Sequence, residues 1–588
     1  MYMFKKLAWF FKQERKAYII GIIMLVFVAI LTGIVPLVIA NVIDQMSSGQ
    51  LTFSQVIYYA ILIIIITILQ YGLRYVWRMN IHGTAAKLEM ILRQRIFNHL
   101  TQMDSQFFHH YRTGDLMARA TNDMNEIQRV AGAGILTLVD SLSQGLITLF
   151  MMFIVIDWRL SVVALLPIPL IAIMISFLGN KVHHYSSLSQ QAFSFMNDKV
   201  QESVTGMKVI KSFGEEALDS KDFQQHTHDV VEQNRMVYIY DAGFRPVSQL
   251  IMGISTVIGL FYGGLLVSRG EVTIGLLVAF LNYVTRMNWP MIAIGSLFNI
   301  LERGSASYDR VEELLNEKSH IIESANPVIQ PIQGDLDILI DSFTYEDEIE
   351  PTLQDIHIHV KEGETLGIVG KTGSGKTTLF KLLMRSYDHY SGSIQFNHIS
   401  IKDYSLDALL GHIGYVPQEH FLFSTSIREN IRFANPKASQ AEVERVAKLA
   451  NIHDDILALP NGYDTLVGER GVALSGGQQQ RISIARAILT YPEVLILDDS
   501  LSAVDAKTEE AILSAIKMNR KGKTTLIAAH RLSSVMHAEE IIVLDEGQII
   551  ERGTHHELVE LNGWYAEMYQ RQQLEEEIEG GDHSDGRK

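Results

Sequence analysis

The hydrophobic positions of the N-terminal half fall into long, nearly uninterrupted runs. Stretches apolar enough to cross roughly 30 Å of hydrocarbon lie at 18–40, 56–76, 133–156, 159–178, 247–268 and 273–298. We therefore expect six membrane-spanning helices. Before them, residues 1–17 alternate basic and aromatic positions, which predicts a short elbow helix in the membrane interface rather than a plain basic flank.

The distribution of basic residues predicts the orientation of these spans. The segment before the first span carries five Lys or Arg residues, whereas the loop 41–52 carries none, so the N-terminus should face the cytoplasm. An even number of spans returns the C-terminus to the same side. The long polar segments 77–132 and 179–246 keep apolar residues at helical spacing, and we expect them to extend the spans into the cytoplasm. Turns near 107–117 and 205–214 should contact the second domain.

From about residue 335 the pattern changes to short apolar runs separated by glycine-containing turns and helical stretches, which is typical of an α/β domain. The predicted fold class is thus a membrane α-helical domain followed by an α/β P-loop nucleotide-binding domain. The predicted boundaries are an elbow helix at 1–17, a transmembrane domain at 18–303, a linker at 304–334, the α/β domain at 335–573 and an acidic tail at 574–588.

Composition and charge exclude several classes of protein. The mean hydropathy of +0.12 with 20% charged residues fits a chain that is part membrane and part soluble domain. A net charge of -16 argues against a nucleic-acid partner, because phosphate binding needs a clustered basic surface. The absence of cysteine from the sequence excludes disulfides, thiolate metal sites and cysteine nucleophiles.

A glycine-rich loop, Gly370-Lys-Thr-Gly-Ser-Gly-Lys376-Thr377, lies between a strand-like run and a helical run. This is the Walker A pattern. Its backbone N–H groups can surround phosphates, while Lys376 reaches the outer phosphates and Thr377 can bind Mg²⁺. A second apolar strand, 494–497, ends in Asp498 and Asp499, so Asp498 is the candidate Mg²⁺ carboxylate.

The segment Leu474-Ser-Gly-Gly-Gln478, followed by a helical run, decides the family. With it, the sequence resembles the ATP-binding cassette (ABC) transporters. In that family, two cassettes enclose two ATP molecules, and the signature of one subunit caps the γ-phosphate held by the Walker A loop of the other. Six spans, two long cytoplasmic loops and one cassette resemble a half-transporter of the exporter type over nearly the whole chain.

The resemblance assigns further roles. Tyr345 is similar to the aromatic residue that stacks on adenine, Gln418 to the Q-loop residue, Glu469 to the exporter X-loop, Asp505 to the D-loop and His530 to the switch histidine. The expected catalytic residues are Asp499, His530 and Gln418, and the expected Mg²⁺ ligands are Thr377, Gln418 and Asp498. The residues expected to contact ATP are Tyr345, Gly370, Lys371, Thr372, Gly373, Ser374, Gly375, Lys376, Thr377, Thr378, Gln418, Ser475, Gly476, Gly477, Gln478, Asp498 and Asp505.

One position departs from the family pattern, because Asp499 stands where the consensus has Glu, the residue that positions the attacking water. The shorter side chain should slow hydrolysis. Together with the intact signature, this resembles one subunit of the heterodimeric bacterial multidrug exporters of the Bmr, Lmr and Efr type. The resemblance implies a bacterial cell-membrane protein whose partners are a second half-transporter, membrane lipid and a hydrophobic small-molecule substrate. A homodimer is the alternative.

The transported substrate is not encoded in a motif. Charge within a span is costly and so indicates function. Candidates for substrate contact are Asp140, Phe244, Arg245, Asn282, Tyr283, Arg286, Trp289 and Phe298. Asp241 and Arg245 are four residues apart and could instead pair with each other, and Arg286 could reach a membrane interface. We expect export of amphipathic drugs. Lipid translocation is the alternative, followed by peptide export and by a soluble regulatory ATPase whose apolar runs would be core helices.

Overall fold

The computed structural model describes residues 2–346, 348–468 and 472–581, which form two compact units. A helical unit comprises residues 1–101 and 113–317, and an α/β unit comprises residues 102–112 and 318–588. The chain therefore leaves the helical unit for a short loop, 102–112, and returns before the α/β unit proper begins. Helix α5 (Ser105–His110) lies in that loop.

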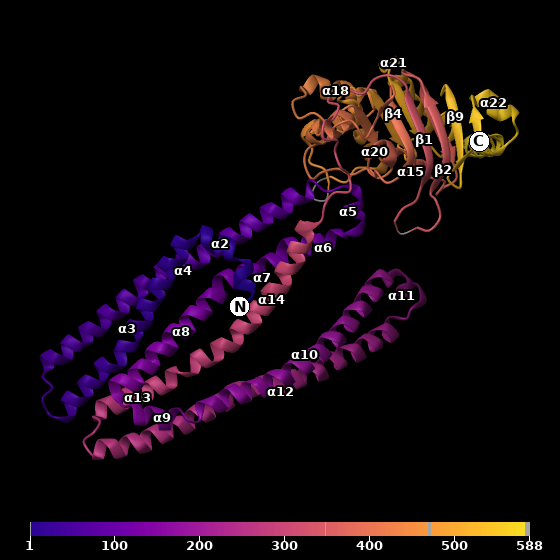
Figure 1. Cartoon of the computed structure of the whole chain (residues 1–588). Coiled ribbons are helices and arrows are strands. Elements are labelled where there is room, and N and C mark those ends of the chain that lie inside the picture. The colour runs from indigo at the N-terminus through magenta and orange to yellow at the C-terminus, as the bar shows by residue number, and fades with distance from the viewer. Residues whose placement is uncertain (1, 347, 469–471, 582–588) are drawn as a thin grey trace. The chain divides into compact units, whose positions relative to one another are not determined.

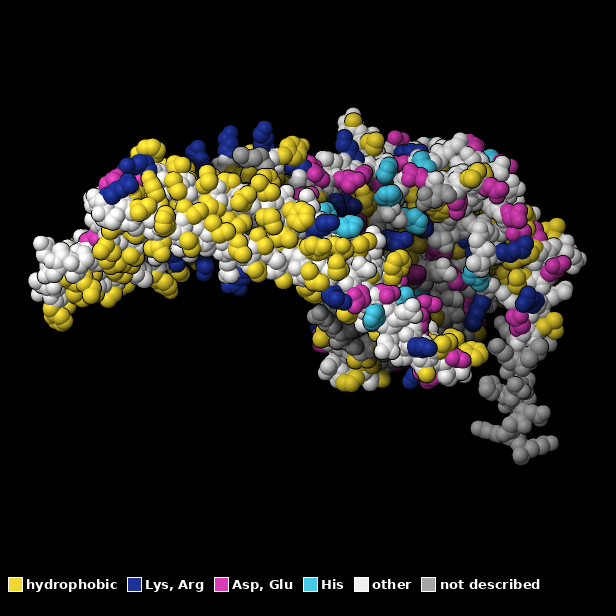
Figure 2. All heavy atoms as spheres, turned by 90° about the horizontal axis from the view of Figure 1, so that it is seen from below, with side chains coloured by type: hydrophobic (Ala, Val, Ile, Leu, Met, Phe, Trp, Pro, Cys, Tyr) yellow, Lys and Arg dark blue, Asp and Glu magenta, His cyan; other side chains and the backbone are white. Residues whose placement is uncertain are grey.

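The helical unit starts with α1 (Tyr2–Lys6) and α2 (Ala8–Gln13). Among the described residues, five helical stretches are long and apolar enough to cross a membrane: α3 (Arg15–Ser47), α4 (Phe53–Leu100), the run from α6 to η3 (Thr113–Ile156), α9 with α10 (Trp158–Thr205) and α12 (Glu216–Ser268). Hydrophobic side chains cover much of the face of this unit seen in Figure 2. The chain is a multi-pass membrane protein.

The third and fourth of these stretches are composite. In the third, the α-helices α6 (Thr113–Ala118), α7 (Met124–Arg129) and α8 (Ile135–Phe150) alternate with the π-helical segments η1 (Arg119–Asp123), η2 (Val130–Gly134) and η3 (Met151–Ile156). The fourth consists of α9 (Trp158–Leu165) and α10 (Ile168–Thr205). Helix α10 runs beside α12, and the short helix α11 (Met207–Phe213) joins them at one tip (Figure 1).

The predicted sixth span, 273–298, is not one continuous helix, and the prediction is wrong in this respect. It is divided between α13 (Ile274–Arg286) and α14 (Asn288–Asn316), with a break at Met287. Pro290 lacks the N–H that would continue the hydrogen-bond ladder across this point. Helix α14 then continues to Asn316, so residues 304–316, which we expected in the linker, are helical.

Three connections predicted on one side of the membrane are tied together by hydrogen bonds and ion pairs. Asp44, near the end of α3, accepts from the backbone N–H of Gly275 at 2.7 Å and from the Thr273 hydroxyl at 2.6 Å. Arg159, at the start of α9, pairs with Glu271 at 2.7 Å. The turns between the first and second, third and fourth, and fifth and sixth spans therefore lie at the same end of the helical unit.

The α/β unit contains two sheets. An antiparallel sheet has the order β2-β1-β4-β5, from β1 (Leu336–Phe343), β2 (Leu353–Val360), β4 (Ser391–Phe396) and β5 (Ile399–Ser400). The main sheet has the order β10-β9-β3-β8-β7-β6, from β3 (Thr365–Gly370), β6 (Ile413–Val416), β7 (Val494–Asp498), β8 (Thr524–Ala528), β9 (Glu540–Asp545) and β10 (Gln548–Gly553). Only β10 is antiparallel to its neighbour there.

The helices of this unit cover the main sheet and close its connections. Their bounds are α15 (Lys376–Leu383), α16 (Leu406–Leu410), α17 (Ile427–Arg432), α18 (Gln440–Leu449), α19 (His453–Ala458), α20 (Gly476–Ile488), α21 (Ala506–Asn519), α22 (His555–Glu560) and α23 (Trp564–Gly581), with 3-10 turns η4 (Gly462–Asp464) and η5 (Leu532–Ser534). Residues 574–581, predicted as part of an acidic tail, continue helix α23.

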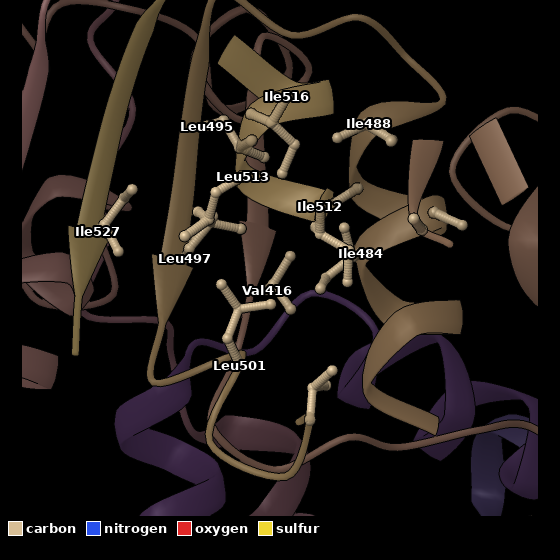
Figure 3. Packing of buried hydrophobic residues seen from close by; sticks show 14 of the residues in the cluster. Val416, Ile484, Ile488, Leu495, Leu497, Leu501, Ile512, Leu513, Ile516 and Ile527 are labelled. Carbon is tan, nitrogen blue, oxygen red and sulfur yellow. The ribbon is translucent and has the colours of Figure 1, made fainter. Parts of the chain in front are cut away.

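Strand β7 shows how the core positions the site. Leu495 and Leu497 face the cluster that α20 and α21 complete with Ile484 and Ile512 (Figure 3). The alternate residues of β7 face a second cluster, shared with α15 and the antiparallel sheet. Because side chains alternate along a strand, Asp498 at the end of β7 is directed to the α15 side of the sheet.

Candidate nucleotide-binding and substrate sites

The Walker A loop is shaped by glycines in conformations that other residues rarely adopt. Gly370 has φ +148°, and a Cβ there would lie 2.0 Å from the carbonyl oxygen of Leu544. Gly375, just before α15, has φ +101°, and a Cβ there would lie 2.6 Å from the Leu353 side chain. No side chain caps the N-terminus of α15. The loop therefore presents free backbone N–H groups at a helix N-terminus, the arrangement that binds phosphate.

Lys376 lies across this loop. Its Nζ donates to the carbonyl oxygens of Gly370 at 2.9 Å and Lys371 at 2.8 Å, and only 7% of the residue is exposed. Burial lowers the pKa of Lys376, and the charges of Asp499 and Asp498 partly oppose this shift. The ammonium is thus held beside the space where phosphate oxygens are expected. The side chain of Lys371 instead pairs with Asp545 at 3.0 Å.

Asp498 is the hydrogen-bonded centre of the site. Its two carboxylate oxygens accept from the Thr377 hydroxyl and from the Tyr415 hydroxyl, each at 3.1 Å. Burial raises the pKa of Asp498; the hydrogen bonds from Thr377 and Tyr415 oppose the shift, and the charge of Asp499 adds to it. Tyr415 was not predicted as a site residue. Its position on β6, the strand before Gln418, was the available signal, because the C-terminal ends of neighbouring parallel strands meet at one edge.

Asp499 occupies a left-handed backbone conformation with φ +47°. Its N–H donates to the carbonyl oxygen of Ala528 at 2.8 Å, which fixes the residue between β7 and β8. Aspartate tolerates this conformation better than most non-glycine residues do.

His420 is a second residue near the site that the sequence did not predict. Burial lowers the pKa of its imidazole, and the charge of Asp499 opposes that shift.

Tyr345 lies at the side of the Walker A helix. Its hydroxyl is 3.0 Å from the Thr378 hydroxyl, and its ring contacts Phe343 and Tyr387 edge-on. The ring borders a cavity of about 320 Å³ whose other lining residues are Gln106, His109, His110, Glu346, Glu348, Lys381 and Tyr387. The loop 102–112 thus contributes directly to the surroundings of Tyr345, as the predicted contact between this turn and the second domain requires.

The signature segment forms the start of α20. Ser475 is the N-cap: its hydroxyl accepts from the N–H of Gln478 at 3.3 Å, and the Gln478 side chain accepts from the N–H of Ser475 at 3.1 Å. A Cβ on Gly477 would lie 2.8 Å from the carbonyl oxygen of Ala503. Within the described chain, the hydrogen bonds of this segment reach its own helix and its flanks, and none joins it to the Walker A loop.

Other predicted site residues lie at loop positions around the sheet edge. Gln418 and His530 are exposed. Asp505 caps α21 by accepting from the N–H of Thr508 at 3.0 Å. Glu469 falls outside the residues that the structure describes. The structure thus brings together the Walker A loop, Thr377 and Asp498, while Gln418, Asp505 and His530 make their hydrogen bonds elsewhere or face solvent.

The substrate candidates of the helical unit separate into two groups. The Asp140 carboxylate on α8 accepts from Gln144 at 2.6 Å and from the indole N–H of Trp289 on α14 at 2.9 Å, and Trp289 remains 48% exposed. Tyr283, by contrast, is fully buried, and its hydroxyl donates to the carbonyl oxygen of Gly33. Tyr283 is therefore a packing residue between α13 and α3 rather than a surface available to a substrate.

The remaining candidates lie on α12, α13 and α14. The Arg286 guanidinium donates to the Asn282 side chain at 3.3 Å, one helical turn away. Phe298 on α14 is 67% exposed. Phe244 and Arg245 lie in α12, and Arg245 is exposed. Among these candidates, the pair Asp140 and Trp289 joins two different spans by a hydrogen bond between side chains.

Known proteins are similar to this chain over nearly its whole length. Residues 18–291 match the family model described as ABC transporter transmembrane region, and residues 353–502 match the model described as ABC transporter. The chain is 46% identical to YheI of Bacillus subtilis, a probable multidrug resistance ABC transporter ATP-binding/permease protein, over 98% of this chain and 99% of that protein. It is 43% identical to the multidrug resistance-like ATP-binding protein MdlA of Escherichia coli, over 98% of this chain and 97% of that protein.

A solved structure agrees with these matches. The structure of a bacterial Atm1-family ABC exporter with ATP bound has a TM-score of 0.75 and 25% identity, and the similarity covers 95% of this chain and 98% of the other. Both halves of the chain, in the same order, are therefore similar to both halves of known exporters. The chain belongs to the ABC transporter family, and it is an ATP hydrolase whose reaction is coupled to transport.

Proposed function

We propose that this protein exports amphipathic drugs or similar hydrophobic small molecules across the bacterial cell membrane, as one subunit of a heterodimer. Its own Walker A and B residues form a slow ATP site with the partner's signature, and its own signature completes the partner's fast site. The names of the relatives YheI and MdlA, which refer to multidrug resistance, support the substrate class. Both termini face the cytoplasm in this proposal, in keeping with the basic N-terminal segment.

The observation that carries the proposal is the identity of residue 499. A carboxylate at this place would accept a hydrogen bond from the attacking water, and in-line attack depends on close placement of that water. Aspartate is shorter than glutamate by about 1.5 Å, one C–C bond. The backbone of Asp499 is left-handed and its N–H is bonded to the carbonyl oxygen of Ala528, so the residue is anchored beside β8.

The residues present fit ATP together with Mg²⁺. The Thr377 hydroxyl and the Asp498 carboxylate lie 3.1 Å apart beside the phosphate loop, and Mg²⁺ prefers oxygen ligands of these kinds. When bound, the ion neutralises phosphate charge. Thr377 and Asp498 would hold it, and Gln418 would join them from the loop after β6. Lys376 would donate to the phosphates, and the uncapped N-terminus of α15 would orient them.

The pair Asp140 and Trp289 supports a positively charged substrate. A carboxylate and an aromatic ring that both retain exposed surface are the two groups that bind an organic cation best. The transporter with its partner, reconstituted in vesicles, should accumulate tetraphenylphosphonium when ATP is supplied. Asp140→Asn should reduce this accumulation about tenfold, equivalent to roughly 1.4 kcal/mol, relative to the neutral triphenylphosphine oxide. Equal reduction of both compounds would assign Asp140 to packing of α8 on α14.

Isolation of the protein from its native membrane tests the heterodimer. A second half-transporter with Glu at the position of Asp499 should co-purify in a 1:1 ratio. A single chain species would favour the alternative, a homodimeric lipid-translocating exporter, and would place two slow sites in one assembly.

A further inference from the structure

We propose that Gln572, on the C-terminal helix α23, is a positioning residue that fixes the backbone of His530 and thereby sets the rate of ATP hydrolysis at this chain's own site. The inference rests on the proposed function and on the role of switch histidine that the family resemblance implies for His530. It extends the nucleotide site to a helix that carries none of its motifs.

The side-chain amide of Gln572 binds the switch segment through two hydrogen bonds. Its Nε2 donates to the carbonyl oxygen of His530 at 2.8 Å, and its Oε1 accepts from the N–H of Leu532 at 2.9 Å. One partner is an acceptor and the other a donor, so the amide can satisfy both in one orientation only. Together the two bonds hold the peptide groups that follow His530, and these determine the direction in which the His530 side chain leaves the backbone.

Helix α23 is anchored strongly enough to serve this purpose. At its start, the Glu551 carboxylate on β10 accepts from the N–H groups of Trp564 at 2.5 Å and Tyr565 at 3.1 Å. Tyr565 is fully buried, and Met568 and Tyr569 pack on the same cluster. Gln572 follows these residues at spacings of seven, four and three, so it lies on the same face of the helix.

The cluster that receives this face also contains the switch segment. Leu532 and Val535, on and next to the turn η5, are buried in it. The apolar face of α23 and the polar tip formed by Gln572 therefore contact one short piece of chain. Packing brings the helix to η5, and the amide then specifies the position of the residue next to it, His530.

The opposite side of the switch segment is held by the D-loop region. Arg531 donates to the carbonyl oxygen of Val504 at 3.1 Å and pairs with Glu509 of α21 at 3.6 Å, and Glu509 is only 2% exposed. Ser534 donates to the same carboxylate. These contacts fix Arg531 and the turn that follows it. The carbonyl of His530, the expected switch histidine, is held by Gln572.

Loss of Gln572 should change catalysis more than stability. His530 is exposed, so water can hydrate its released carbonyl, whereas the N–H of Leu532 belongs to a buried residue and its release should cost a little stability. A misplacement of about 1 Å at a reacting centre can cost on the order of 100-fold in rate. We expect a smaller loss from a loosened but still anchored segment, about tenfold in kcat, with the KM for ATP unchanged because His530 does not hold the nucleotide in the ground state.

The test uses the full-length transporter assembled with its partner. The partner's Walker A lysine is replaced by alanine, so that its own site binds ATP poorly. Single-turnover hydrolysis then reports the rate at this chain's site. Gln572→Ala should slow hydrolysis about tenfold. Gln573→Ala is the matched control, because Gln573 is the next residue of α23, is exposed, and donates to the Tyr569 hydroxyl at 2.8 Å instead. The control should retain its rate, and the melting temperature of Gln572→Ala should lie only slightly below that of the control, because one N–H of a buried residue loses its partner.

A second set of variants separates the positioning by Gln572 from the role of His530. Gln572→Glu keeps the acceptor for Leu532 but loses the donor to His530, so it should be as slow as Gln572→Ala. In a His530→Ala background, Gln572→Ala should cause no further loss. The positioning role of Gln572 would be overturned by an unchanged rate for Gln572→Ala. It would also be overturned if Gln572→Ala slowed the His530→Ala variant as much as it slows the wild type. An unchanged rate for His530→Ala would remove the proposed role of His530, and this inference with it.

Discussion

Two helices of the α/β unit begin at glycine-rich segments that are both expected to bind phosphate, yet their N-termini differ. Helix α15 begins after Gly375 without any side-chain cap, and its lysine already lies across the phosphate loop. Helix α20 begins after Ser475, whose hydroxyl closes a capping box with Gln478. The first N-terminus has no side-chain cap, whereas at the second the Ser475 hydroxyl accepts from one of the first backbone donors, the N–H of Gln478.

In the proposed heterodimer, the two N-termini have different tasks. The site around α15 needs a ligand to complete its hydrogen bonding, and Asp498, Thr377 and Lys376 surround the place for it. The first turn of α20 is held by the Ser475 capping box, which leaves the N–H groups of its glycines for the partner's nucleotide in the proposed heterodimer. In the proposed heterodimer, the short side chain of Asp499 slows the α15 site, while the signature at α20 matches the family pattern, so changes at the two places should have unequal consequences.

The largest expected effect is that of Ser475→Ala. If this signature serves the fast site, loss of its hydroxyl should reduce turnover about 100-fold, the typical cost of removing one transition-state donor. Ser439→Ala is the matched control, because Ser439 caps α18 with the same capping box. Both variants should lose about 1 kcal/mol of stability, but only Ser475→Ala should lose turnover.

The comparison with the partner sharpens this prediction. In the proposed heterodimer the corresponding serine of the partner's signature serves the slow site, so its replacement should cost turnover much less. The ATP turnover of the two serine variants should be measured in the assembled complex at saturating ATP. Equal losses would remove the assignment of fast and slow sites to the two chains.

A smaller effect on turnover is expected for Lys376→Ala. ATP binding at this chain's own site should weaken on the order of 100-fold, because a charged donor to the phosphates is lost. Turnover should fall only about tenfold, since the partner's site remains complete. Lys523→Ala is the control: Lys523 makes two hydrogen bonds, to Tyr491 and Glu493, in another part of the unit. Complete loss of turnover would show that both sites must be filled.

The smallest effect is expected for Tyr415→Phe, which removes one hydrogen bond from Asp498. Loss of a hydrogen bond to a charged group costs about 1.5 kcal/mol, so the apparent affinity for Mg²⁺ with ATP should fall about tenfold at this site. Overall turnover should change less than twofold in the proposed heterodimer, because this site contributes little to it. Tyr491→Phe, which removes a hydroxyl bonded to Asn519 instead, should leave both quantities as they are.

Much of this architecture is predictable from the sequence because short motifs impose it. The spacing of Gly370 and Gly375 predicts a phosphate-binding loop. In the structure both have positive φ, and a Cβ at either position would clash with a neighbour. The alternation along β7 similarly places Asp498 on the α15 side. These features depend on neighbours in the sequence, and local patterns describe them well.

The features that sequence analysis missed depend on contacts between distant segments. Tyr415, His420 and Gln572 acquire their significance only when strands and helices pack together, and each was an ordinary residue by itself. The break at Met287 lies inside an apolar run that hydropathy treats as continuous. Proline was a weak signal there, since Pro36 and Pro246 lie within unbroken helices.

The short carboxylate of Asp499 is the centre of this account, and its lengthening is the most direct test. Asp499→Glu should be compared with Asp499→Asn, which keeps a side chain tolerant of the left-handed conformation but removes the charge. In a complex whose partner lacks its own catalytic glutamate, ATP turnover should rise at least about tenfold with Glu and should stay at the background level with Asn. Rapid hydrolysis by the wild-type chain alone, with no gain from Asp499→Glu, would contradict the slow-site account.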